Sequence, residues 1–193
     1  LLGKGQSGHI HSIGFTLYTE LLERAIEAIR KGKLPDSIMM FDEDVEIKLN
    51  IPALIPEEYL PDVHTRLIMY KRIANAASDA ELYELQVEMI DRFGLIGDHL
   101  KNLFQVTSLK LYARSIGINR LEAGAEGGRI EFSSNTSVEP LAIVELVQGQ
   151  PNIYCLQGSS TLKFKYKMET AAQRIQQATD LLYLLAPAAS SRQ

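Results

Sequence analysis

Reactive and metal-binding side chains are few in this 193-residue chain, and none are grouped as a catalytic site would require. His9 and His11 are one residue apart, a spacing that some metal sites use, but no cysteine or further histidine lies near them in the sequence. The stretch GKGQSG at 3–8 holds glycines, but its lysine precedes the loop, so it does not match a phosphate-binding loop. We therefore predict no catalytic residue, no metal ligand and no cofactor site in this chain.

The remaining candidates have ordinary structural explanations. His64 and His99 lie near predicted helix starts, where surface or capping roles are expected. Cys155 takes an inward position in a predicted strand, which favours core packing; because it is the only cysteine, it cannot form a disulfide within the chain, and this fits a reducing compartment. The acidic run at 42–44 is similar to a helicase acidic box, but such a box ends a buried strand, whereas this run lies in a predicted linker.

The predicted helix over 78–94 has an acidic face. Ser78 and Glu81 form a capping box at its start, and Gly94 ends it. Recurrence at three- and four-residue steps places four carboxylates on one purely acidic face: Glu81, Glu84, Glu88 and Asp91. The same periodicity predicts two buried apolar faces: Leu82, Leu85, Met89 and Phe93 on one, Tyr83, Val87 and Ile90 on the other. The acidic face fits either a solvated surface or a surface that docks an arginine-bearing partner.

A second charged surface is basic. In the strand LKFKYK at 162–167, the apolar side chains alternate with Lys163, Lys165 and Lys167. A basic strand face can follow a phosphate backbone, so these three lysines are candidate DNA contacts. The alternative is that they discourage edge-to-edge strand pairing, and no aromatic side chain lies on their face to stack on bases.

Composition narrows the class of protein. The length allows one domain, or one domain with an appendage. The net charge of −4 argues against general coating of nucleic acid, and no apolar run approaches the roughly 20 residues that span a bilayer. The chain starts LLGKGQSG, without Met, so we expect a piece of a longer protein. These features predict a cytoplasmic protein that is not bound to a membrane.

The order of the elements predicts an α+β fold, with a long N-terminal helix, a linker, and a compact domain of short antiparallel strands packed with four to five helices. Helices are predicted at 12–32, about 62–77, 78–94, 98–117, 138–147 and about 170–185. Strands are predicted at 45–51 and in two hairpins, 118–123 with 129–132 and 152–156 with 162–167. The boundaries follow: a linker at 34–44, the compact domain at 45–186, and a disordered tail at 187–193.

Four stretches resemble a known family in the expected order, over nearly the whole chain. LLGKGQSGHIHSIGFTLYTELLERAI resembles the end of the motor module of the bacterial transcription-repair coupling factor, where a GxxQSGHI loop leads into a hook-like helix. PALIPEEYLPDVHTRLIMYKRIANA, ELQVEMIDRFG and LKFKYK resemble the C-terminal domain of that family. On this resemblance, residues 1–33 are the translocation-motif loop and the hook-like helix.

The resemblance implies a function for the longer parent protein. The family's parent is an ATP-driven translocase on double-stranded DNA that displaces stalled RNA polymerase. It recruits nucleotide-excision repair through a module, here called the recruiting module, that binds the damage-recognition subunit. The C-terminal domain covers the recruiting module in the resting state, which implies an autoinhibitory, non-enzymatic role for this chain. ATP and magnesium belong to the parent's motor.

The resemblance also assigns roles to particular residues. Gln6 matches the glutamine of the translocation motif, together with Ser7, Gly8 and His9. Glu88 and Asp91 match positions that meet the recruiting module, and Glu84 and Glu81 share their acidic face. Two rival functions remain open. One is a DNA-contacting accessory module that uses the lysine strand and the N-terminal loop, and the other is a small enzyme of unrelated kind.

Overall fold

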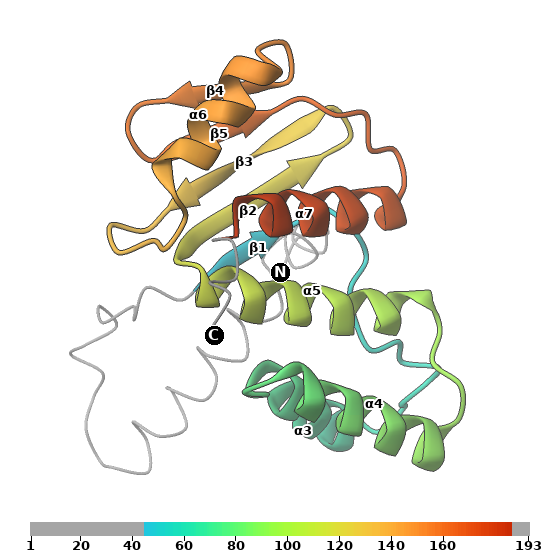
Figure 1. Cartoon of the computed structure of the whole chain (residues 1–193). Helices are drawn as coiled ribbons and strands as arrows, with labels where there is room; N and C mark the ends of the chain where they lie inside the picture. The colour runs from blue at the N-terminus through green and yellow to red at the C-terminus, as the bar shows by residue number, and fades with distance from the viewer. Residues whose placement is uncertain (1–44, 187–193) are drawn as a thin grey trace, which may run out of the picture. The chain divides into compact units, whose positions relative to one another are not determined.

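The computed structural model describes residues 45–186, which form two compact units. The first unit contains residues 54–100, and the second contains residues 45–53 and 101–186. The predicted N-terminal helix at 12–32, the linker at 34–44 and the tail at 187–193 lie outside the described residues, so the predicted domain boundaries stay predictions. Figure 1 shows the helices and strands with the labels used below.

The first unit contains the helices α3 (Val63–Ala74) and α4 (Asp79–Phe93). Asp62 is the N-cap of α3, and its carboxylate accepts a hydrogen bond from the backbone N–H of Thr65 at 2.7 Å. Within α3, Val63 is exposed and Met69 is buried. Val63 is the first helical residue, at the open end of the helix. The buried residues of this unit include Met69, Tyr70 and Ile73 from α3 and Leu82, Leu85 and Met89 from α4.

The second unit is built on a five-stranded sheet with the order β1-β2-β3-β5-β4. The strands are β1 (Glu46–Lys48), β2 (Ile118–Gly124), β3 (Gly127–Phe132), β4 (Tyr154–Gln157) and β5 (Thr161–Phe164). Both predicted hairpins are confirmed, since β2 pairs with β3 and β4 with β5 in antiparallel register. The prediction of antiparallel strands is wrong for β1, which pairs with β2 in parallel, so the sheet is mixed.

Helices cover one face of this sheet. α6 (Pro140–Gly149) lies against β4, α7 (Ala171–Leu185) lies against β2, and the two helices contact each other (Figure 1). The part of α5 (Asp98–Ser115) in this unit adds Leu109 and Ala113 to the same core. The strands contribute Leu121, Ile130, Leu162 and Phe164, each at most 2% exposed. Apolar residues at alternate strand positions therefore form one core under these helices.

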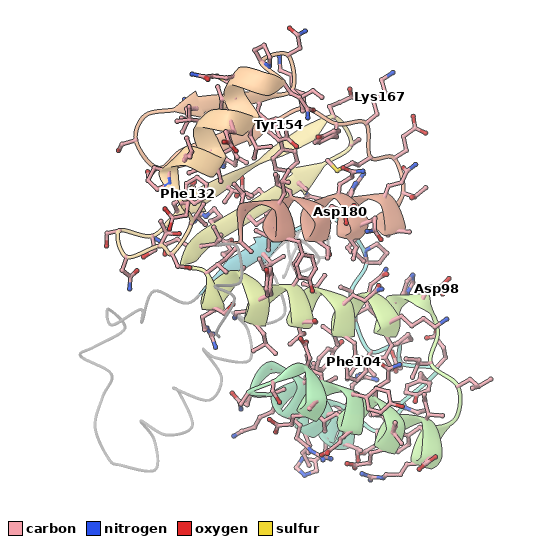
Figure 2. The ribbon with its side chains drawn as sticks, in the orientation of Figure 1. Asp98, Phe104, Phe132, Tyr154, Lys167 and Asp180 are labelled. Atoms are coloured by element: carbon pink, nitrogen blue, oxygen red, sulfur yellow. The ribbon has the colours of Figure 1, made fainter. Side chains whose placement is uncertain are left out.

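The opposite face of the sheet is charged. Arg120 pairs with Glu46 at 2.8 Å, and Arg129 pairs with Glu122 at 2.8 Å. Glu131 lies within 4.0 Å of both arginines, so positive and negative side chains alternate across three strands. In Figure 2 the labelled Phe132 and Tyr154, both buried, belong to the covered face instead.

The inward position predicted for Cys155 is wrong. Cys155 is exposed, whereas its neighbour Tyr154 is buried. Cys155 stands opposite Lys163 in the β4–β5 register, so both side chains lie on the face of the sheet that none of the helices within residues 45–186 covers. Pairing with β5 sets the alternation of β4, and this places Tyr154 rather than Cys155 in the core.

The end of the first strand is held by residues far away in the sequence. Arg174 of α7 donates from Nη1 to the carbonyl oxygen of Asn50 at 2.6 Å and from Nε to that of Met168 at 2.9 Å. Asn50 has a φ of 52°, and its side chain donates to the carbonyl oxygen of Ala123 at 2.9 Å. These bonds join the chain after β1 to α7 and β2 within the second unit. No helix within residues 45–186 is long and apolar enough to cross a membrane.

Candidate functional site

The predicted acidic helix is α4 of the first unit, and its ends form as the sequence indicates. The Ser78 hydroxyl accepts a hydrogen bond from the backbone N–H of Glu81 at 3.3 Å. The Glu81 carboxylate accepts one from the backbone N–H of Ala77 at 2.8 Å, one residue earlier than in the standard capping box. Gly94 ends the helix with a φ of 95°. Glu81 therefore acts as a cap.

Two tyrosines fix the surroundings of α4. The Tyr59 hydroxyl lies 2.9 Å from the carbonyl oxygen of Met89 and 3.0 Å from that of Gly94, at the C-terminal end of the helix. The Tyr70 hydroxyl of α3 accepts a hydrogen bond from the backbone N–H of Ile55 at 2.8 Å. These bonds hold the connecting segments against the helix pair, so the outward surface of α4 has a defined position within this unit.

Glu88 joins α3 to α4. Arg72 of α3 donates from Nη1 to Oε1 of Glu88 at 2.8 Å and from Nη2 to Oε2 at 2.6 Å, which is a bidentate pair. Arg92, one turn further along α4, donates to Oε1 at 2.7 Å. The hydrogen bonds from Arg72, followed by those from Arg92, lower the pKa of the Glu88 carboxyl to about 2.

The acidic face is therefore not purely acidic. Both oxygens of Glu88 are occupied by arginines of the same unit, and Glu81 caps the helix. Glu84 and Asp91 are exposed, and neither forms an ion pair with another residue of 45–186. An open groove of about 390 Å³ borders this face, and its lining includes Ile68, Arg72, Asn75, Glu84 and Glu88. The carboxylates available to a partner here are those of Glu84 and Asp91.

The variant Glu88→Gln is expected to lower the melting temperature at neutral pH by about 1–4 °C, because the Arg72–Glu88–Arg92 network is worth about 0.5–1 kcal/mol at an exposed position. The folded-state pKa of Glu88 is about 2, below its ordinary 4.5. Its stabilising effect is therefore full above pH 4.5 and is lost as the pH falls towards 2. Thermal melts of the unsubstituted chain and of the variant are compared from neutral pH downwards. The difference between their melting temperatures should shrink between pH 4.5 and pH 2. Glu84→Gln is the matched control, and an equal loss in both variants would contradict a role for the network.

The second apolar face predicted for α4 is not buried. Tyr83 is 67% exposed and Val87 is 40% exposed, while Ile90 is half-buried. Helical periodicity correctly places the three residues on one face, but it does not say whether a neighbouring element covers that face. In YELQVEMID, Tyr83 and Val87 lie among three carboxylates. This neighbourhood indicates exposure, and the prediction from periodicity did not take it into account.

The three candidate DNA-contacting lysines are all exposed, as predicted, but only Lys163 lies in β5, which ends at Phe164. Lys165 and Lys167 follow in the segment that leads to α7, and Figure 2 shows the labelled Lys167 extending outward. None of the three forms an ion pair with a described residue. Arg129, which stands opposite Lys163, is neutralised by Glu122, so the lysines do not extend into a larger basic surface. DNA contact stays a prediction.

Other predicted positions can be located only in part. The translocation-motif residues Gln6, Ser7, Gly8 and His9 lie outside the described residues, as do His11 and the acidic run at 42–44. His64 and His99 are exposed near the starts of α3 and α5. Residues 45–186 contain no group of three or more histidine, cysteine, aspartate or glutamate residues that could hold a metal.

A second hollow, in the second unit, gives no support to the enzyme hypothesis. It has a volume of about 300 Å³ and lies at the C-terminal end of α5. Its polar lining consists of Arg114, Ser115, Asn119, Ser133, Asn135 and Ser137, and it contains no carboxylate, histidine or cysteine. This lining contains none of the side chains that usually act as a general acid or base: histidine, carboxylate, lysine, tyrosine or cysteine.

Comparison with known proteins agrees with the resemblance noted in the sequence. The family model described as the TRCF domain matches residues 49–143. The transcription-repair-coupling factor of Haemophilus influenzae is 45% identical over 186 residues, which are 96% of this chain and 16% of that protein. The corresponding protein of Escherichia coli is 42% identical, over 91% of this chain and 15% of that protein. That of Bacillus subtilis is 39% identical over 72% of this chain and 12% of that protein.

The fold also has a solved counterpart. A crystal structure of the C-terminal domain of transcription-repair coupling factor matches 74% of this chain and 94% of that one, with a TM-score of 0.60 and 22% identity. The chain belongs to the transcription-repair coupling factor family. It spans only 16% and 15% of the Haemophilus and Escherichia relatives, so it corresponds to a small part of their length.

Proposed function

We propose that this chain is a regulatory, autoinhibitory interaction domain of a transcription-repair coupling factor. The observation that supports it best is the outward surface of α4, where the carboxylates of Glu84 and Asp91 have no ion-pair partner among residues 45–186 and lie beside exposed apolar side chains. Such a surface repels nucleic-acid phosphates and suits a partner that bears arginines. The partner is the recruiting module of the same parent, which the chain covers in the resting state.

The proposal extends to the parent protein. The parent is an ATP-driven translocase on double-stranded DNA that displaces stalled RNA polymerase, and the exposed recruiting module binds the damage-recognition subunit of excision repair. ATP and magnesium bind in the parent's motor, outside this chain, so we expect no ATP hydrolysis by the chain itself. Gln6, with Ser7, Gly8 and His9, belongs to the translocation motif that couples ATP hydrolysis to movement on DNA.

Glu88 takes a different part in this proposal from Asp91. Arg72 and Arg92 already occupy its two oxygens, so an arginine of the recruiting module has to share Glu88 with them or displace Arg72. Asp91 lies one turn away from Val87 on the exposed side and is open to a new partner. Glu88 thus supports the docking surface from within, while Asp91 and Glu84 meet the partner directly.

A direct binding measurement tests the proposed function. The purified chain is expected to bind the separately expressed recruiting module of its own parent, measured by calorimetry. The affinity should fall about tenfold between ~0.05 and ~0.5 M salt, because exposed charges across an interface are screened. No detectable binding at about 100 μM of each protein would overturn the proposal, because even a weak binding free energy of about 5–6 kcal/mol would be detected at that concentration.

A DNA-contacting accessory module is the second candidate. It is supported by the exposure of Lys163, Lys165 and Lys167 and by their lack of acidic partners among residues 45–186. Glu46, Glu122 and Glu131 on the same sheet face work against it, because their negative charge repels a phosphate backbone. The same calorimeter run with duplex DNA in place of the recruiting module separates the two candidates.

A further inference from the structure

The hollow at the C-terminal end of α5 lies where the described part of the chain begins. Val45 is one of its lining residues and is 5% exposed, and β1 begins beside the end of α5 (Figure 1). Consecutive Cα atoms are about 3.8 Å apart, so the three residues before Val45 have their Cα atoms within about 4, 8 and 11 Å of it, whatever direction the chain takes. These residues are the acidic run Asp42, Glu43 and Asp44. The covalent chain therefore keeps their carboxylates within reach of the hollow.

The lining of the hollow suits a carboxylate. Arg114, in the last turn of α5, is the one charged residue among the described residues that line it. The side chains of Asn119 and Ser137 also line it, and neither forms a side-chain hydrogen bond with another residue of 45–186. Asn135 accepts a hydrogen bond from the Ser133 hydroxyl at its Oδ1, so its side-chain N–H groups are left to donate. A guanidinium surrounded by hydrogen-bond donors is a favourable environment for a carboxylate.

Hydrogen bonds between its walls hold the hollow in shape. The Thr136 hydroxyl and the backbone N–H of Ser137 both donate to the carbonyl oxygen of Ile116, at 2.8 Å and 3.2 Å. The backbone N–H of Ser133 donates to the carbonyl oxygen of Gly117 at 2.9 Å. These bonds occupy carbonyl groups after α5 that would otherwise repel a carboxylate. The donors are therefore in position before anything binds.

We propose that the acidic run at 42–44 binds in this hollow. Its carboxylates pair with the Arg114 guanidinium and accept hydrogen bonds from the amide groups of Asn119 and Asn135. The run is then the anchor of the predicted linker at 34–44, because its residues no longer add to the length that the linker can span. A shorter tether raises the effective concentration at which this domain meets the other modules of its parent. This role is independent of the α4 surface and of the recruiting module.

A tethered occupant is favoured over a separate one. Because the run is joined directly to a lining residue, its effective concentration at the hollow is on the order of millimolar or more. A free phosphate ion, or an acidic segment of another protein, would have to exceed that concentration to displace it. Competition by phosphate is therefore a second way to detect the contact.

Cleavage by a glutamate-specific protease tests the inference on the complete 193-residue chain, because Glu43 lies within the acidic run. The rate of cleavage after Glu43, followed by mass spectrometry, reports the fraction of the time that the run is out of the hollow. Arg114→Gln is expected to raise this rate about fivefold at low salt, and the difference should shrink at high salt. Lys163→Gln is the matched control, since it removes the same charge from an exposed position of the second unit, and it should leave the rate unchanged.

An exchange of charges separates pairing from a structural effect of Arg114. Asp42→Lys with Asp44→Lys should leave the run outside the hollow, because lysines and Arg114 repel each other. Adding Arg114→Glu to these two substitutions should slow cleavage again, about fivefold. Both variants have the same sequence around Glu43, so the preference of the protease cancels. A lower melting temperature cannot imitate this result, because a loss of stability can only speed cleavage.

Three outcomes would overturn the inference. The first is cleavage of the Arg114→Gln variant at the rate of the unsubstituted chain, and the second is an equal increase in the Arg114→Gln and Lys163→Gln variants. Phosphate at about 10 mM and constant ionic strength should speed cleavage of the unsubstituted chain by competing for the same donors. The third contrary outcome is phosphate binding that leaves the rate unchanged, since the hollow would then bind an anion other than the acidic run.

Discussion

Reversing the charge of Glu84 and Asp91 to arginine is expected to open the parent protein, so that its recruiting module binds the damage-recognition subunit much more tightly. Two charge-assisted hydrogen-bonded contacts sheltered in an interface contribute about 1.5 kcal/mol each. Their loss alone shifts the closed-to-open equilibrium by about 3 kcal/mol, which is roughly 150-fold, and repulsion between the new arginines and those of the partner adds to it. The measurement is the dissociation constant of the complete parent for the damage-recognition subunit, with and without the two substitutions.

Glu88 is deliberately left unchanged in this variant. Arg72 and Arg92 converge on it, so an arginine at position 88 would place three cations together and would destabilise the α3–α4 pair. The control is Glu145→Arg with Glu169→Arg, which makes the same change in net charge at exposed positions of the second unit. The isolated chain should keep its melting temperature in both variants. Equal affinity for the damage-recognition subunit in the parent and in the Glu84, Asp91 variant would mean that these carboxylates are only a solvated face.

Gly117→Ala is expected to destabilise the chain by about 4 kcal/mol. Gly117 has a φ of 73°, in the left-handed region, and an added Cβ would lie 2.5 Å from the backbone Cα of Thr136. The backbone strain costs about 1–3 kcal/mol and the steric overlap about as much again. The neighbour cannot move freely, because the Thr136 hydroxyl donates to the carbonyl oxygen of Ile116 at 2.8 Å. Thermal unfolding should show a melting temperature about 8–16 °C lower.

Two further glycines separate the causes. Gly94 has a φ of 95° but open space around its Cβ position, so Gly94→Ala should show the strain without the overlap, about 1–2 kcal/mol. Gly149, at the end of α6, has open space and no positive φ, so Gly149→Ala should be neutral or slightly stabilising, by less than about 1 kcal/mol. If the three variants lost the same free energy of unfolding, the close approach of the added Cβ to Thr136 would not contribute to the destabilisation.

Local signals predicted most of the elements. Ser78 and Gly94 bound α4 as their capping preferences indicate, and Thr170 caps α7 where the last helix was expected to begin. The strand predicted at 45–51 contains β1, and Val45 and Leu49 on either side of β1 are buried. Both hairpins also formed around the expected turns. These features depend on residues within a few positions of one another, so a sequence states them directly.

The candidate site was predicted only in part. Periodicity correctly placed Glu84, Glu88 and Asp91 together on α4, away from the buried leucines. It did not reveal that Arg72, 16 residues earlier in the chain, donates to both oxygens of Glu88. A charge pattern within one helix contains no information about the side chains of a helix packed beside it, so Glu88 looked as available as Asp91.

The sequence by itself therefore determined most of the helices and strands within residues 45–186, and the family. Which faces are covered was decided by packing. Tyr83 and Val87 were expected in the core and are exposed, because no other element among residues 54–100 lies over them. Cys155 points outward because β4 takes its alternation from β5. The chain just after β1 is held at Asn50 by Arg174, which is 124 residues away. Covering a face requires a second element from elsewhere in the chain, and its position follows from the balance of contacts in the whole unit rather than from any one stretch of residues.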